Sequence, residues 1–186
     1  MNITQEQIAQ WIKDYTDAYG DDVHKREWDG KYIPSHAPYN NADDCYHKWL
    51  DWVACNEVRI SALPTFEDIM SELYKNRIKG IGPLTIYDTA TMLAFPKGKF
   101  PQQVHLQVGA ERGARALDVV GSTVPKQVFV DICPDFAGLS TAQIEDFLCI
   151  YSVYLMQDTV GIARFEEKLS KVCGSNPGHR GCACKK

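Results

Sequence analysis

The stretch Ile78 to Thr85, IKGIGPLT, constrains the fold of this 186-residue chain more than any other. The segments on both sides of it carry apolar residues at helical spacing. The link between them is about as short as a helix–helix connection can be. Gly80 and Gly82 can take positive φ without strain, and Pro83 suits the first position of a helix. The stretch therefore predicts a tight helical hairpin, with Ile81 plugged into the core.

Helical spacing also dominates the rest of the chain. The predicted inner faces are Ile8, Trp11, Ile12, Tyr15 and Tyr19; Tyr46, Trp49, Leu50 and Val53; Phe66, Ile69, Met70 and Leu73; and Ile86 or Tyr87, Ala90, Leu93 and Ala94. Capping signals precede three helices, at Thr4 with Gln7, Thr65 with Asp68 and Ser140 with Gln143. Residues 20–41 are expected to form an irregular loop. No strand alternation or repeat stands out.

These patterns predict an all-α fold with seven or eight helices. The chain is expected to form one helical domain over residues 1–186, with the hairpin at about 65–95 and a cysteine-containing tail at about 173–186. From Val104 onward a further helix is expected, with Val104, Val108 and Leu117 facing inward. This segment is rich in small residues, including Gly109 and Gly113, which permit close approach by another helix or by a ligand.

Charge is distributed unevenly along the chain, whose net charge is −4. Residues 1–72 hold 6 basic and 14 acidic side chains, whereas residues 75–128 hold 8 basic and 3 acidic ones. The asymmetry predicts a local basic face for an anionic partner, with chance clustering as the alternative. No apolar run is long enough for a transmembrane helix, and the N-terminus does not look like a signal peptide. We therefore expect a cytoplasmic protein that does not bind membranes.

The hairpin can form an anion site. The N–H groups at the start of the helix after Pro83 lack intrahelical acceptors, and the positive end of the helix dipole lies behind them. Such a terminus binds phosphate. Lys75, Arg77 and Lys79 add positive charge just before it.

The same residues resemble the helix-hairpin-helix motif of DNA-binding proteins. Ile78, Gly80, Ile81, Gly82, Pro83 and Thr85 occupy its characteristic places, while Ile86 stands where the family usually has alanine. The resemblance implies sequence-independent binding of the duplex DNA backbone, often with a bound monovalent cation at the hairpin. The residues expected to contact DNA are Lys79, Gly80, Ile81, Gly82, Pro83, Leu84, Thr85, Lys97, Lys99, Arg112 and Arg115. The alternative is an ordinary tight turn between helices.

A looser resemblance, covering Pro64 to Leu117, is to the helix-hairpin-helix base-excision DNA glycosylases, and it implies a two-lobed fold and a role in DNA repair. The family's catalytic aspartate would fall near His105, and the hairpin lysine of its bifunctional members at Leu84. With both signature residues missing, His105 and Lys99 are the remaining catalytic candidates, as a base and as a nucleophile on an abasic sugar. An active DNA glycosylase or AP lyase is thus one alternative function.

The C-terminal residues Cys173, His179, Cys182 and Cys184 could form a zinc site. Some glycosylases of the resembled superfamily hold an iron–sulfur cluster at their C-terminal end, but their cysteine spacing does not match this chain. Free thiols or a disulfide are the other interpretations, and no cofactor is firmly implied.

A third function remains open, namely a protein-interaction domain with a purely structural hairpin. The acidic first 72 residues, with Trp11, Trp28, Trp49 and Trp52, would then provide the partner surface. No phosphate-binding loop, dinucleotide-binding loop or Gly-x-Ser-x-Gly motif is present to suggest other chemistry.

Overall fold

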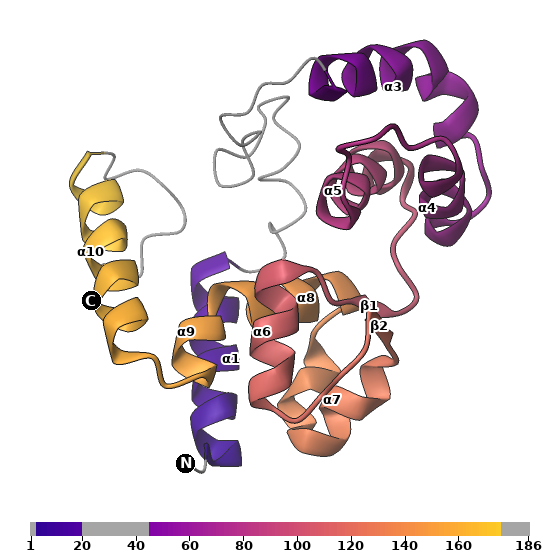
Figure 1. Cartoon of the computed structure of the whole chain (residues 1–186). Coiled ribbons are helices and arrows are strands. Elements are labelled where there is room, and N and C mark those ends of the chain that lie inside the picture. Colours follow the sequence, from indigo (N-terminus) through magenta and orange to yellow (C-terminus); the bar gives the residue numbers. More distant parts are fainter. Residues whose placement is uncertain (1–2, 20–44, 176–186) are drawn as a thin grey trace. The chain divides into compact units, whose positions relative to one another are not determined.

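The structure, a computed structural model, describes residues 3–19 and 45–175 (Figure 1). In these ranges the chain is mostly helical, with nine α-helices and two very short strands, which confirms the all-α prediction. The chain expected as one domain divides into two compact units. Unit 2 is residues 24–102, and unit 1 combines residues 1–23 with residues 103–186. The loop predicted over residues 20–41 lies outside the described residues.

Unit 2 contains α3 (Cys45–Ser61), α4 (Phe66–Lys75), α5 (Pro83–Ala94) and the 3-10 turn η3 (Phe95–Lys97). Its core is built from the predicted stripes, and both Ile86 and Tyr87 are buried. The indole Nε1 of Trp49 donates to Thr89 Oγ1 at 3.1 Å, which ties α3 to α5. Leu50, predicted to face inward, is 37% exposed, so that prediction is wrong.

Unit 1 contains α1 (Gln5–Tyr19), β1 (Val104–His105), α6 (Val108–Ala116), β2 (Thr123–Val124), α7 (Lys126–Ile132), η4 (Pro134–Gly138), α8 (Thr141–Ile150), α9 (Ser152–Leu155) and α10 (Thr159–Ser175). Its core combines many aliphatic side chains with the rings of Tyr15, Phe129, Phe136 and Phe147. Phe147 meets Tyr15 edge-on at 5.8 Å and Phe136 at 5.4 Å. The predicted stripe of α1 is confirmed at Ile8, Ile12 and Tyr15.

The segment from Val104 to Ala116 corrects two predictions. The expected helix begins only at Val108, because Val104 and His105 form β1, antiparallel to β2 with Val104 opposite Val124. Strands of two residues are too short for alternation to be visible, which is why none was expected. Val108 is 50% exposed, so its predicted inward placement is also wrong.

The small residues of α6 serve a helix contact, not a ligand. A Cβ at Gly113 would lie 2.3 Å from the carbonyl oxygen of Leu148, and one at Gly109 would lie 2.5 Å from Cys149 Sγ. Both contacts are on α8, so only glycines allow α6 to approach α8 this closely.

All three predicted capping boxes are present, and each fixes where a helix begins. In the first, Thr4 N donates to Gln7 Oε1 at 2.9 Å and Gln7 N donates to Thr4 Oγ1 at 3.3 Å. The boxes at Thr65 and Ser140 have the same reciprocal pattern. The helix that begins after Ser140 ends at Ile150, and the short helix α9 follows directly after Tyr151. Within the described ranges, no helix has the length and apolarity needed to cross a membrane.

Candidate nucleic-acid interface

The link from α4 to α5 turns through one left-handed glycine. Gly80 has φ of +100°, a conformation that L side chains rarely adopt. Gly82 instead has φ of −91° and ψ of 173°, an extended N-cap conformation. Ile81, between them, is buried as predicted, and its N–H donates to Ile78 O at 3.1 Å. The two glycines therefore have different roles, since only Gly80 needs its backbone freedom.

The start of α5 presents unused donors. The N–H of Ile86 donates to Gly82 O at 3.1 Å, but no described hydrogen bond takes the N–H of Leu84 or Thr85. Pro83 occupies the first helical position, and Gly82 has no side chain to cap the helix. A Cβ at Gly82 would have nothing within 4 Å, so the approach to this terminus is open.

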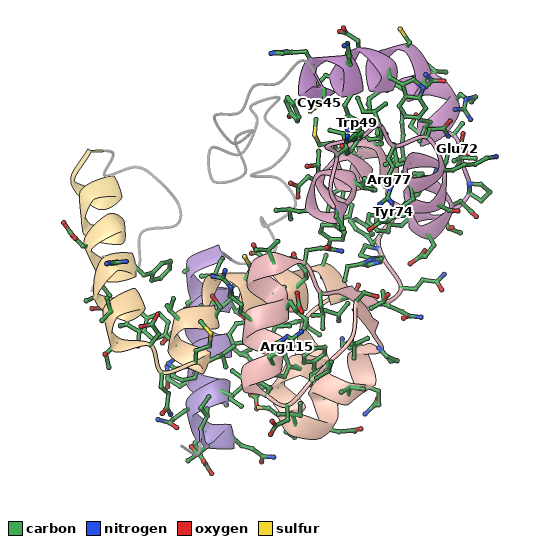
Figure 2. The ribbon with its side chains drawn as sticks, viewed as in Figure 1. Cys45, Trp49, Glu72, Tyr74, Arg77 and Arg115 are labelled. Atoms are coloured by element: carbon green, nitrogen blue, oxygen red, sulfur yellow. The ribbon has the colours of Figure 1, made fainter. Side chains whose placement is uncertain are left out.

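Positive charge lies just before these donors. Lys75, Arg77 and Lys79 are exposed. Arg77 sits over the ring of Tyr74, with 5.9 Å from Cζ to the ring centroid (Figure 2). Asp88 is the only acid between Lys75 and Lys99. Donors and cations together fit an anion such as a phosphodiester.

The helix α3 packs against the hairpin turn. Cys45 Sγ lies 3.0 Å from where a Cβ on Gly80 would stand, so it packs directly against the turn (Figure 2). Arg59 donates to Glu72 at 2.7 Å and links α3 to α4. This hydrogen bond is the main cause that lowers the pKa of the Glu72 carboxyl below its ordinary value.

Lys97 and Lys99, both predicted to contact DNA, differ in their surroundings. Lys97 is exposed at the end of η3. Lys99 is half-buried, and its Nζ donates to the carbonyl oxygens of Ser61 at 2.6 Å and Leu63 at 2.5 Å. The ammonium of Lys99 thus stabilises the C-terminal end of α3, so we assign it a structural role.

Replacing Lys99 with methionine tests this assignment. The variant keeps the apolar stem but leaves two carbonyl groups without their charged donor, which should lower the free energy of unfolding by about 1–3 kcal/mol. Urea unfolding followed by circular dichroism measures the change. Lys97→Met is the matched control and should change stability by less than about 0.5 kcal/mol. Equal effects of the two substitutions would contradict the structural role of Lys99.

The remaining predicted contacts belong to unit 1. Arg112 and Arg115 lie on α6, where Arg115 pairs with Glu111 at 2.7 Å (Figure 2). His105 is half-buried in β1, opposite Thr123, and not at the start of a helix. The hairpin, Lys97 and Lys99 therefore belong to unit 2, while His105 and the two arginines belong to unit 1.

A base-excision reaction needs a pocket for the extruded base and a carboxylate beside it. One described pocket lies in unit 1 and is lined by Ile3, Ala116, Leu155, Met156 and Gln157. These described lining residues include no acid, no lysine and no histidine. Neither His105 nor Lys99 lines it.

The predicted metal ligands fall outside what the structure describes. His179, Cys182 and Cys184 are not among the described residues, and Cys173 is in α10 without a described side chain. Among the residues that are described, no group of three or more His, Cys, Asp or Glu side chains could hold a metal ion.

The tryptophans predicted as a partner surface are largely in the interior. Trp49 is fully buried, and Trp52 is half-buried and stacks on it at 5.2 Å. Trp11 is half-buried beside Tyr154 at 6.0 Å. Trp28 lies outside the described residues. For Trp49 the prediction is wrong, because its ring is part of the unit 2 core.

Phe100, which directly follows Lys99 in the sequence, is 48% exposed and was not among the predicted site residues. An aromatic residue within a lysine-containing loop was the available signal.

Comparison with known proteins adds no assignment. Protein-family models, curated proteins and solved structures were all compared, and none matches this chain.

Proposed function

We propose that this protein binds the backbone of duplex DNA, independently of sequence, through a helix-hairpin-helix element made of α4, α5 and their link. The observation that carries the proposal is the open start of α5. There the N–H groups of Leu84 and Thr85 have no described acceptor, and a Cβ on Gly82 would meet nothing within 4 Å. A phosphate oxygen fits this position, because backbone donors and the helix dipole both favour negative charge.

The proposed interface is defined by Lys75, Arg77, Lys79 and the backbone from Gly82 to Thr85, and we call it the hairpin surface. Lys97, beyond the far end of α5, is a further proposed contact. Its contacts are to phosphate, and phosphate contacts position a protein without reading base sequence. Unit 1 residues Arg112 and Arg115 could add to binding, but the proposal does not depend on them. A resemblance to glycosylases, including their catalysis, stays a separate proposal, and the described residues that line the pocket in unit 1 do not add support to it.

Salt dependence tests the proposal. Fluorescence anisotropy of a labelled duplex should show binding that weakens steeply with salt, with a slope of about −2 to −4 in log K against log salt if two to four of the cations contact phosphates. Two duplexes of unrelated sequence should bind equally. Affinity unaffected by salt, or no binding at low salt, would contradict the proposal and favour a protein-interaction domain.

The enzyme alternative is tested on the same samples. A duplex with one abasic site is incubated with the protein and run on a denaturing gel. Strand scission would favour a lyase, and release of a base from damaged duplex would favour a glycosylase. With intact strands and salt-sensitive binding, the non-catalytic function stands.

A further inference from the structure

Arg77 is held by an aromatic ring and not by a carboxylate. Its guanidinium lies over the ring of Tyr74, with 5.9 Å between Cζ and the ring centroid (Figure 2). Arg59 and Arg115, in contrast, each donate to a glutamate at 2.7 Å. Within the described parts of the chain, the Arg77 guanidinium has no hydrogen bond or ion pair. Its N–H donors therefore remain available to an external ligand.

The acidic residue nearest to Arg77 in the sequence is already engaged. Glu72, five positions earlier, accepts hydrogen bonds on Oε1 from Arg59 at 2.7 Å and from Asn76 Nδ2 at 3.1 Å. The next acidic residue along the chain lies 11 positions after Arg77, whereas the two lysines of the hairpin surface flank it in the sequence. These surroundings favour an anionic partner for the free donors.

The ring below the guanidinium is itself fixed. Tyr74 is half-buried and packs against the core of unit 2. Its carbonyl oxygen accepts a hydrogen bond from Arg77 N at 3.4 Å, so the backbone keeps the two residues about one turn apart. The face of an aromatic ring attracts a guanidinium, and the edges of the planar fork stay free to donate. A long flexible side chain is thereby ordered before a ligand binds.

We infer that Tyr74 is a positioning residue, which holds the Arg77 guanidinium ready for a bidentate contact with a phosphate of the DNA backbone. The planar fork of arginine matches two oxygens of one phosphate, a geometry that the single ammonium of lysine does not reproduce. Ordering a long side chain during binding costs affinity, and a ring that orders it beforehand removes part of this cost. This inference rests on the proposed function and names the phosphodiester group as the partner of Arg77.

A double-mutant cycle on the full chain tests the pair, with duplex affinity measured by fluorescence anisotropy. Tyr74→Leu should weaken binding about 2- to 12-fold, because Arg77 must then be ordered at each binding event. In Arg77→Met the same Tyr74 substitution should leave affinity unchanged, since no guanidinium remains to be ordered. Lys79→Met is the control background, in which Tyr74→Leu should weaken binding by the same factor as in wild type. Tyr74→Phe keeps the ring and should bind as wild type does.

Arg77→Lys separates the fork from its charge. This variant should weaken duplex binding about 2- to 12-fold through the loss of one hydrogen bond, with an unchanged slope of log K against log salt. Arg77→Met should in addition reduce the magnitude of that slope by about 1. Arg77 is exposed, so these variants are decisive even if unfolding curves show that Tyr74→Leu does not fold.

Equal weakening by Tyr74→Leu in wild type and in Arg77→Met would overturn the positioning role, because it would indicate a structural effect. Wild-type affinity in Arg77→Lys, or lost binding in Tyr74→Phe, would also contradict it. In each of these cases, salt-sensitive duplex binding by wild type leaves the hairpin proposal intact. If wild type does not bind duplex at low salt, both proposals fail.

Discussion

Replacing Gly113 with alanine should destabilise unit 1 by about 3 kcal/mol or more. The added Cβ would lie 2.3 Å from the carbonyl oxygen and 3.0 Å from the carbonyl carbon of Leu148. These are backbone atoms of a fully buried residue in α8, so they cannot rotate away as a flexible side chain would. The helices α6 and α8 must therefore move apart, which loses packing along their whole contact. The loss of stability is expected to be among the largest that single substitutions cause.

Because the chain has two compact units, hydrogen exchange resolved by peptide is the informative measurement. Protection should fall in α6 and α8 and persist in α4 and α5. Gly138→Ala is the matched control in unit 1, because a Cβ there would have nothing within 4 Å. It should change stability by less than about 0.5 kcal/mol. Equal hydrogen exchange in Gly113→Ala and Gly138→Ala would contradict the close contact between α6 and α8.

The parts of the fold that could be predicted depend on neighbours in the sequence. A capping box needs residues three apart, and an amphipathic stripe needs residues three and four apart. For this reason the boxes at Thr4, Thr65 and Ser140 and the stripe of α4 are all as predicted. The turn at Gly80 and the buried Ile81 follow from the same kind of local pattern.

The errors concern interactions between distant residues. Val104 pairs with Val124 in a strand of two residues, a partner that no local pattern indicates. Lys99 could be read from sequence only as a surface cation, because its acceptors are backbone carbonyls 36 and 38 positions earlier. The exposure of Phe100 likewise depends on how its loop is held to α3 by Lys99. The residue types of the hairpin could be predicted, but the different conformations of Gly80 and Gly82 could not.

Replacing Gly82 with valine should abolish DNA binding at moderate salt in a protein that still folds. The φ of −91° and ψ of 173° are open to valine, and its Cβ would meet nothing within 4 Å. Loss of a good N-cap residue should cost roughly 1 kcal/mol of stability. The side chain would instead occupy the space through which a phosphate reaches the N–H groups of Leu84 and Thr85. Losing these charge-assisted hydrogen bonds should weaken binding by about tenfold to several hundredfold.

Two other variants separate this steric effect from a change of fold. Gly80→Ala should destabilise unit 2, because Gly80 has φ of +100° and Cys45 Sγ lies 3.0 Å from the new Cβ. Gly138→Val introduces the same side chain as Gly82→Val at an open position in unit 1, and it should leave duplex affinity unchanged. Fluorescence anisotropy titrations measure the duplex affinity of each variant, and unfolding curves measure its stability. If folded Gly82→Val binds duplex as wild type does, no phosphate sits at the start of α5, and the hairpin is a structural turn whose glycines serve packing alone.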